Sequence, residues 1–285
     1  MGWVHLALAV CGFVAMNFLM KLGILRGYSS LQLTTSLFIF ASFYCLLFLF
    51  FGPGPLYASS SVVLLAIAGG WGGAVAYFFF LRALGIGNYA LTISIYTLTF
   101  LNPVIFSIIV WQSPFTFLIA LGISGIISGL ILISLAGLTL ETQKTDLYLK
   151  WIAFLAASFL LTGIPQVSQA AVVRLQAVNL WFYLFLAFLS GSFVFILYLA
   201  LKGKTPLTRT FPSGALAAAG SVAGNFFLMK ALSRLPEPVV FPINQAGPII
   251  AAVLLSLFYF KEKIRPIAYL GIALGVAGIA LLSRR

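Results

Sequence analysis

Ten long apolar runs, separated by short polar breaks, constrain this chain more than any other feature of its sequence. A helix needs about 20 mostly apolar residues to cross the hydrocarbon core of a bilayer. Only 7% of the residues are charged, against about a quarter in a soluble domain, so little polar surface is available to face water. The runs cover residues 3–20, 31–51, 62–84, 89–111, 115–136, 149–171, 179–201, 213–232, 239–259 and 264–282. The sequence therefore predicts an all-α polytopic membrane protein with ten transmembrane helices.

The breaks between the runs are all short. Short connections favour sequence neighbours that pack as antiparallel hairpins, and they leave no room for an extramembrane domain. The 16 basic residues outnumber the four acidic ones, which gives a net charge of +12. They are scattered over many breaks, as expected for charges that orient helices in a membrane, and they form no patch suited to nucleic acid. We expect the lipid bilayer and a small-molecule solute as partners, and no nucleic acid.

The two halves of the chain, residues 1–140 and 145–285, show the pattern of a repeat. Adding 145 to the residue number carries Pro103 onto Pro248. Each half holds five predicted helices, an odd number, so the halves cross the membrane in opposite senses. Two inverted repeats are typical of transporters that alternate access to a central cavity. Adding 148 carries Gly72, Phe78, Phe79, Ala83 and Leu84 onto Gly220, Phe226, Phe227, Ala231 and Leu232.

Two inverted repeats of five helices resemble the drug/metabolite transporter superfamily, in particular its ten-helix EamA-type members. In that family the first four helices of each half line the cavity and the fifth packs outside. Glu262, with a lysine on each side, resembles the family's acidic turn before the last helix, whereas residues 111–114 of the first half contain no acid. The resemblance covers essentially the whole chain and implies a transporter without implying its solute. The glycine-spaced fifth helix of each half is also similar to the family's, through Gly122, Gly125 and Gly129 and through Gly271, Gly275 and Gly278.

Charge distribution and family resemblance lead to different orientations. The count of Lys and Arg in the breaks favours both termini outside, whereas ten-helix relatives are usually described with both termini cytoplasmic. The even number of spans requires both termini on one side, and the orientation stays open. We expect a multi-pass protein of a bacterial inner (plasma) membrane.

Polar side chains in the middle of predicted spans are the candidate substrate-binding residues. In lipid such groups are costly unless they face a cavity or one another. They recur on matched helices of both halves, while the fifth helix of each half has almost none. Each of them can equally serve as a hydrogen bond that holds two helices together. The set is Asn17, Tyr77, Tyr96, Thr99, Gln166, Gln169, Asn225, Asn244 and Gln245.

Three prolines inside predicted helices are candidate hinges for gating. Pro103 and Pro248 occupy equivalent positions in the two halves, and Pro165 interrupts the sixth helix. Proline removes one backbone hydrogen bond and permits bending, and the freed carbonyl can face a cavity. A static kink is the alternative reading, and it suits Pro165 better than the matched pair.

Three basic residues, Lys21, Arg82 and Lys230, fall in the last turns of predicted helices. Cations at these positions suit the helix dipole and can reach the membrane interface. Arg82 and Lys230 are repeat equivalents, however, so the alternative is one charge at each mouth of the cavity. Such charges would attract a carboxylate or phosphate of the solute.

The four acidic residues, Glu141, Asp146, Glu237 and Glu262, lie in breaks or at helix ends. A proton-coupled cation antiporter needs a carboxylate within the membrane. The small multidrug relatives have a glutamate in the first helix, where this chain offers only Asn17. We therefore expect export, uniport or exchange of a small polar metabolite, an amino acid or similar, by alternating access. The alternatives are an anionic phosphorylated or sugar-type solute, and a non-transporting membrane scaffold.

No group of residues suggests catalysis or cofactor binding. His5 is the single histidine, and the two cysteines, Cys11 and Cys45, lie within apolar runs. The sequence lacks the clustered His, Cys and carboxylate ligands of a metal site, and it has no nucleophile beside a base within the spans. We expect no enzymatic activity, no metal and no other cofactor, and a monomer or homodimer.

Overall fold

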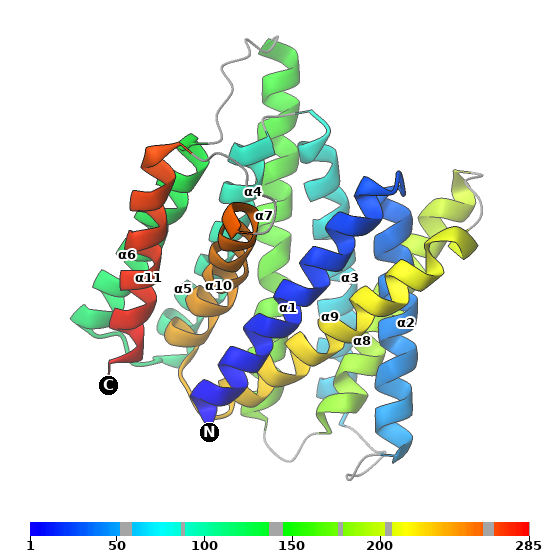
Figure 1. Cartoon of the computed structure of the whole chain (residues 1–285). Coiled ribbons are helices and arrows are strands. Elements are labelled where there is room, and N and C mark those ends of the chain that lie inside the picture. The colour runs from blue at the N-terminus through cyan, green and yellow to red at the C-terminus, as the bar shows by residue number, and fades with distance from the viewer. Residues whose placement is uncertain are drawn as a thin grey trace. The chain divides into compact units, whose positions relative to one another are not determined.

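The computed structural model describes residues 1–51, 59–86, 89–136, 145–175, 179–202, 207–258 and 265–284, and over these residues it consists of helices (Figure 1). The bounds follow the predicted runs closely, and the span predicted over 89–111 is formed by α4, η1 and α5 together. The elements are α1 (Gly2–Leu25), α2 (Ser30–Phe51), α3 (Ser60–Leu84), α4 (Tyr89–Thr97), the 3₁₀ turn η1 (Leu98–Phe100), α5 (Leu101–Trp111), α6 (Phe117–Ala136), α7 (Thr145–Arg174), α8 (Leu180–Leu201), the 3₁₀ turn η2 (Leu207–Thr210), α9 (Phe211–Leu232), α10 (Glu237–Phe258) and α11 (Pro266–Ser283).

Length and composition make most of these helices suitable for crossing a bilayer. Within the described residues, eight helices are long and apolar enough to do so: α1, α2, α3, α6, α7, α8, α9 and α11. Many large apolar side chains on them are exposed, including Leu64 and Phe193, as expected where lipid rather than water is the solvent. The predicted all-α polytopic fold is confirmed.

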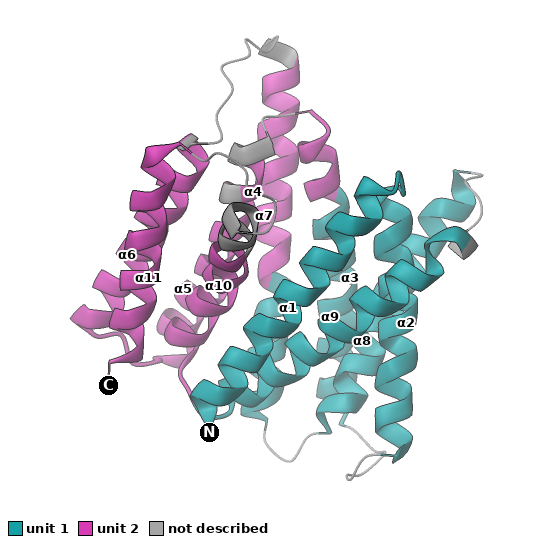
Figure 2. Ribbon diagram, in the orientation of Figure 1, with its two compact units in different colours: residues 1–78, 164–234 teal, residues 79–163, 235–285 magenta. Residues whose placement is uncertain are grey.

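The chain divides into two compact units (Figure 2). Unit 1 contains residues 1–78 and 164–234, and unit 2 contains residues 79–163 and 235–285. Each unit takes helices from both of the predicted repeats, so the units do not coincide with the halves 1–140 and 145–285. The division of the sequence into two repeats stays a prediction.

In unit 1, α1 packs along α9, and α2 packs against α8 and α9. Glycines allow α1 and α9 to meet backbone to backbone. A Cβ atom on Gly12 would lie 2.6 Å from the backbone nitrogen of Gly224, and one on Gly220 would lie 2.8 Å from the carbonyl oxygen of Gly12. The main partner of α1 is thus α9 and not its sequence neighbour α2, so the expected sequential hairpin is wrong for this helix.

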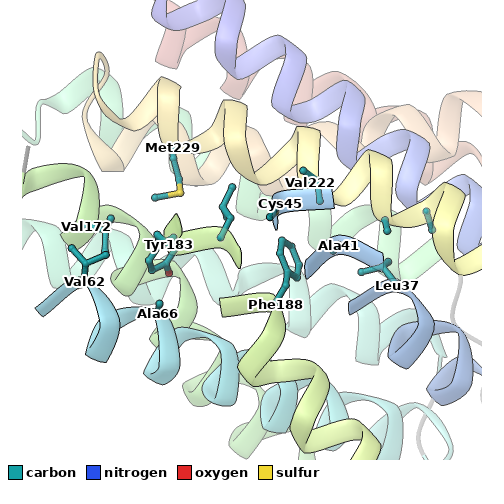
Figure 3. Close-up of a cluster of buried hydrophobic side chains, with 13 residues drawn as sticks. Leu37, Ala41, Cys45, Val62, Ala66, Val172, Tyr183, Phe188, Val222 and Met229 are labelled. Carbon is teal, nitrogen blue, oxygen red and sulfur yellow. The ribbon is translucent and has the colours of Figure 1, made fainter. Parts of the chain in front are cut away.

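Buried side chains from five helices form the hydrophobic core of unit 1 (Figure 3). Tyr183 is 1% exposed, and its hydroxyl lies 2.8 Å from Ser168 Oγ. Because Ser168 Oγ donates its own proton to the carbonyl oxygen of Leu65, Tyr183 is the donor in this pair. Both hydroxyl groups in this part of the core are therefore hydrogen-bonded. The labelled members are Leu37, Ala41, Cys45, Val62, Ala66, Val172, Tyr183, Phe188, Val222 and Met229.

In unit 2, α6 packs along α11, and α10 packs against α5, α11 and α6. The glycines of α6 and α11 lie in direct contact. A Cβ atom on Gly129 would lie 2.6 Å from the carbonyl oxygen of Gly271, and one on Gly278 would lie 2.6 Å from that of Gly122. The residue order of these contacts makes the two helices antiparallel. The glycine stripes that resemble the family's terminal helices therefore pack within one chain.

Candidate functional site

Two of the candidate polar residues in unit 1 are hydrogen-bonded to each other. Gln169 Nε2, on α7, donates to Asn225 Oδ1, on α9, at 2.6 Å. Asn225 Nδ2 in turn donates to the carbonyl oxygen of Ser221 at 2.8 Å. The amides thus form a short chain that ties α7 to α9. Such a chain is the arrangement expected of interhelical hydrogen bonds in a bilayer, and it also keeps amide groups half-buried rather than sealed in the core.

The remaining candidates of unit 1 are more dispersed. Gln166, one turn before Gln169, has a buried side-chain oxygen with no hydrogen-bond partner among the described residues. Tyr77 is half-buried on α3, and Asn17 and Lys21 are exposed on α1. Because α1 continues to Leu25, Lys21 lies directly before the last turn, so its predicted place within that turn is corrected.

In unit 2, the candidates of α10 meet the 3₁₀ turn η1. Gln245 Nε2 donates to Thr99 Oγ1 at a distance of 3.4 Å, and Thr99 is fully buried. Asn244, the residue before Gln245, is only 6% exposed, yet its Oδ1 has no hydrogen-bond partner among the described residues. The structure therefore brings Thr99 and Gln245 together, and Asn244 directly precedes Gln245 in α10.

The matched prolines stand four residues after Thr99 and Asn244. In an α-helix the residue at i+4 donates its N–H to the carbonyl of residue i, and proline has no N–H to give. Pro103 therefore cannot serve the carbonyl of Thr99, and Pro248 cannot serve that of Asn244. At Thr99 the chain tightens into η1, whose closing N–H groups bond the carbonyls of Leu98 and Thr99. A 3₁₀ turn within a membrane span is a place where hinges occur.

Unlike Pro103, the candidate hinges Pro165 and Pro248 lie in the interior of continuous α-helices. Pro165 lies inside α7, and Pro248, together with Pro242, lies inside α10. The ring of Pro165 faces Gly73 of α3, where a Cβ atom would lie 3.6 Å from its Cγ. This contact gives Pro165 a packing role in unit 1.

Neighbouring aromatic rings cover the candidate Tyr96 and also Trp181. Tyr96 is stacked on Phe80 in unit 2, with ring centroids 4.0 Å apart. In unit 1, Trp181 lies between Phe226, at 4.0 Å, and Phe48, at 4.6 Å, with nearly parallel rings on both sides. Both faces of the indole are therefore covered by protein.

The three candidate basic residues are all exposed. Arg82 and Lys230 lie in the last turns of α3 and α9, as predicted. Lys230 Nζ lies 5.5 Å from the ring centroid of Phe226, within the range of a cation–π contact. This contact directs the charge of Lys230 toward an aromatic side chain of its own helix.

Two polar links in unit 2 were not anticipated from the sequence. Ser113 Oγ donates to Glu237 Oε2 at 2.8 Å, and Glu237, in the first turn of α10, is only 5% exposed. Asn102 Nδ2 donates to the carbonyl oxygen of Phe159 at 2.6 Å and so ties α5 to α7. The signal for Asn102 was present, because it is an amide in the middle of an apolar span. Ser113 and Glu237 stand beside prolines at the ends of spans, a pattern typical of exposed turns.

The chemistry of these groups is that of hydrogen bonding. The candidates in the described spans are amides, hydroxyls and aromatic rings, and the amides and hydroxyls can both donate and accept hydrogen bonds. Among the described residues, no three His, Cys, Asp or Glu side chains are grouped so that they could hold a metal ion.

The model of the EamA-like transporter family matches residues 149–284. A crystal structure of another protein is similar over 97% of this chain and 96% of that chain, with a TM-score of 0.76 and 18% sequence identity, which shows that the two share a fold. No curated protein matches the sequence. Residues 149–284, the second half of the chain, are thus an EamA-like transporter domain of the drug/metabolite transporter superfamily.

Proposed function

We propose that this membrane transporter moves a small polar metabolite, an amino acid or a similar zwitterion, by alternating access. The observation that carries the proposal is the chemistry of the polar positions that are buried or half-buried in apolar segments. Five such residues are uncharged: Thr99 in η1 and Asn244 and Gln245 in α10, all in unit 2, and Gln169 and Asn225 in unit 1. Neutral donors and acceptors suit a solute that carries both charges or none.

We further propose that transport is not driven by proton exchange for a cation. All four acidic residues of the chain lie at positions 141, 146, 237 and 262, in breaks or in the first turns of helices. Proton-coupled carriers use a carboxylate that is loaded within the membrane. The chain therefore suits export, uniport or exchange of one solute for another. We propose that it works as a monomer or homodimer in a bacterial inner membrane.

The experiment is flux into proteoliposomes that contain the purified full-length protein. The panel holds neutral amino acids, aromatic amino acids, sugar phosphates and quaternary amines, each with and without a pH gradient. Amino-acid flux that ignores the gradient supports the proposal. Preference for sugar phosphates would instead assign solute binding to the exposed basic residues Lys21, Arg82 and Lys230. Cation flux driven by the gradient would overturn the uncoupled mechanism, and an inactive protein would favour a scaffold.

A matched pair of variants separates the site from general effects on the fold. Gln245→Leu removes the amide that bonds Thr99, and we expect it to lower flux of the best substrate several-fold. Ser124→Ala on α6 removes an exposed hydroxyl that bonds only its own helix, to the carbonyl of Ala120, and we expect flux to be unchanged. Equal losses in both variants would argue against a role for Gln245.

A further inference from the structure

Hydrogen-bond acceptors exceed donors around Asn244 of α10. Its side chain is 6% exposed, and Oδ1 has no hydrogen-bond partner among the described residues. Its backbone carbonyl is the one that Pro248, four residues later, cannot serve with an N–H group. The side-chain oxygen of this buried residue thus has no donor among the described residues, and its carbonyl lacks the i+4 donor that an ordinary helical position would supply.

At the equivalent position of the other predicted repeat, the protein itself supplies the missing hydrogen-bond donors. Adding 145 to the residue number carries Thr99 onto Asn244, as it carries Pro103 onto Pro248. At Thr99 the chain forms η1, so the carbonyl gains a closer N–H, and Oγ1 accepts from Gln245. α10 instead runs as one α-helix from Glu237 to Phe258. The acceptors at Thr99 are satisfied internally, and those at Asn244 point to a donor from outside the chain.

A group with several N–H donors suits two acceptors that belong to one buried residue. An ammonium group has three, and its positive charge strengthens each bond. The same stripe of α10 also carries an acidic side chain, since Glu237 lies seven residues earlier and two helical turns are about seven residues. Glu237 is 5% exposed, and its Oε2 accepts a hydrogen bond from Ser113, so a second oxygen acceptor of this stripe is buried and not in bulk water.

We propose that Asn244, through Oδ1 and its proline-freed carbonyl, binds the ammonium group of the transported solute. The solute class is therefore a primary amine or amino acid, and not its uncharged or purely anionic analogue. This inference rests on the proposed function, because it assigns one part of the solute to one residue of the same site.

The test compares solutes that differ only in the ammonium group, such as an amino acid and the matching 2-hydroxy acid. Flux of both is measured in proteoliposomes with the wild type, Asn244→Leu and Asn244→Asp. Leu has a similar volume and no acceptor, whereas Asp keeps the shape and offers acceptors only. We expect the wild type to prefer the amino acid by about tenfold or more, Asn244→Leu to lose that preference, and Asn244→Asp to keep or increase it.

Asn102→Leu is the matched control. It makes the same substitution in the same unit, but at an asparagine whose Nδ2 donates to the carbonyl of Phe159. We expect it to lower the amount of folded protein without changing the preference between the paired solutes. Loss of preference in Asn102→Leu, retention of preference in Asn244→Leu, or loss of preference in Asn244→Asp would each overturn the assignment.

A binding measurement keeps the inference separable from transport. The paired solutes are titrated against the purified full-length protein while its melting temperature is followed. Stabilisation by the amino acid in the wild type and in Asn244→Asp, but not in Asn244→Leu, supports the assignment even if no flux is found, an outcome that would overturn only the proposed function. Absence of stabilisation in the wild type, or equal stabilisation in Asn244→Leu, overturns the assignment. Replacing sodium by choline in the buffer tests whether a metal ion binds at these acceptors. Stabilisation by sodium in the absence of the amino acid would mean a metal ion site and would overturn the assignment.

Discussion

At the scale of single residues, Asn225 and Asn244 place the same amide in apolar helices with different results. Asn225 accepts from Gln169 and donates to Ser221, so its hydrogen bonds close within the protein. Asn244 Oδ1 is buried without a partner among the described residues. A buried unpaired polar group costs about 1–3 kcal/mol, a penalty that a ligand can remove when it binds. The hydrogen bonds of the first asparagine therefore join two helices, and the second is the residue that we propose for binding.

The pair Gln169 and Asn225 gives a prediction about stability. A double-mutant cycle of Gln169→Leu and Asn225→Leu should show a coupling free energy of about 0.6–2 kcal/mol, because such hydrogen bonds in membranes have that strength. Reversible unfolding in mixed detergent micelles measures it. A coupling near zero would mean that the 2.6 Å contact contributes nothing to folding.

Ser113 gives a second prediction at this scale. Ser113→Ala removes the hydroxyl that donates to the buried Glu237, and it should lower the free energy of unfolding by about 1–3 kcal/mol. Ser113→Thr retains a hydroxyl and should lose less than half of that amount. The same unfolding measurement compares both with Ser124→Ala, which should match the wild type. Equal stability of Ser113→Ala and Ser113→Thr would contradict the role of the hydroxyl.

Sequence reasoning selected polar residues because they are atypical within lipid, but it could not assign their partners. An amide inside a span needs a hydrogen bond, and nothing in the sequence says whether a helix or a solute provides it. Glu237 illustrates the limit, because its position beside two prolines is typical of an exposed turn. Glu237 is buried, and its hydrogen-bond donor Ser113 lies more than 120 residues away in the sequence.

At the scale of helices, close packing depends on glycine and the break in a span depends on proline. Gly129 of α6 meets the backbone of α11, and the span of α4 and α5 is interrupted by η1 just before Pro103. The lengths of the spans could be predicted because a bilayer selects about 20 apolar residues. The pairing of helices could not, because lipid is as apolar as the helices and only the detailed fit of their surfaces distinguishes one partner from another.

The contact of α6 with α11 predicts a graded response to added methyl groups. Gly129→Ala should lower the melting temperature strongly, because its Cβ would lie 2.6 Å from the backbone oxygen of Gly271. Gly125→Ala should have a smaller effect, since its nearest neighbour would lie at 3.3 Å. Gly85→Ala, with no neighbour closer than 3.7 Å, is the control. A reversed order, measured in detergent, would contradict the contact.

The interruption at η1 predicts opposite effects on stability and flux. Pro103→Ala restores an N–H donor for the carbonyl of Thr99, so α4 and α5 can form one regular helix. We expect an unchanged or higher melting temperature together with flux reduced several-fold, as measured in proteoliposomes. Normal flux with a regular helix would show that the turn is a static feature.

At the scale of the whole molecule, each compact unit combines helices from both ends of the sequence. α1 finds its partner in α9, and α6 finds its partner in α11. Segments 1–140 and 145–285, expressed separately, should therefore not accumulate as folded proteins. Expressed together, they should copurify through a tag on one segment, and Gly129→Leu should reduce the yield of the pair. Stable accumulation of either segment alone would contradict this dependence.

The distance in sequence between Gly12 and its contact Gly224 has a consequence for synthesis. A ribosome adds about 5–20 residues per second, so the partner of α1 emerges roughly 10–40 s after α1 itself. During that interval the glycine face of α1 is open to any passing helix in the bilayer. Until α9 has been made, the glycine face of α1 must therefore be covered by lipid, by the insertion machinery or by another helix of the same chain.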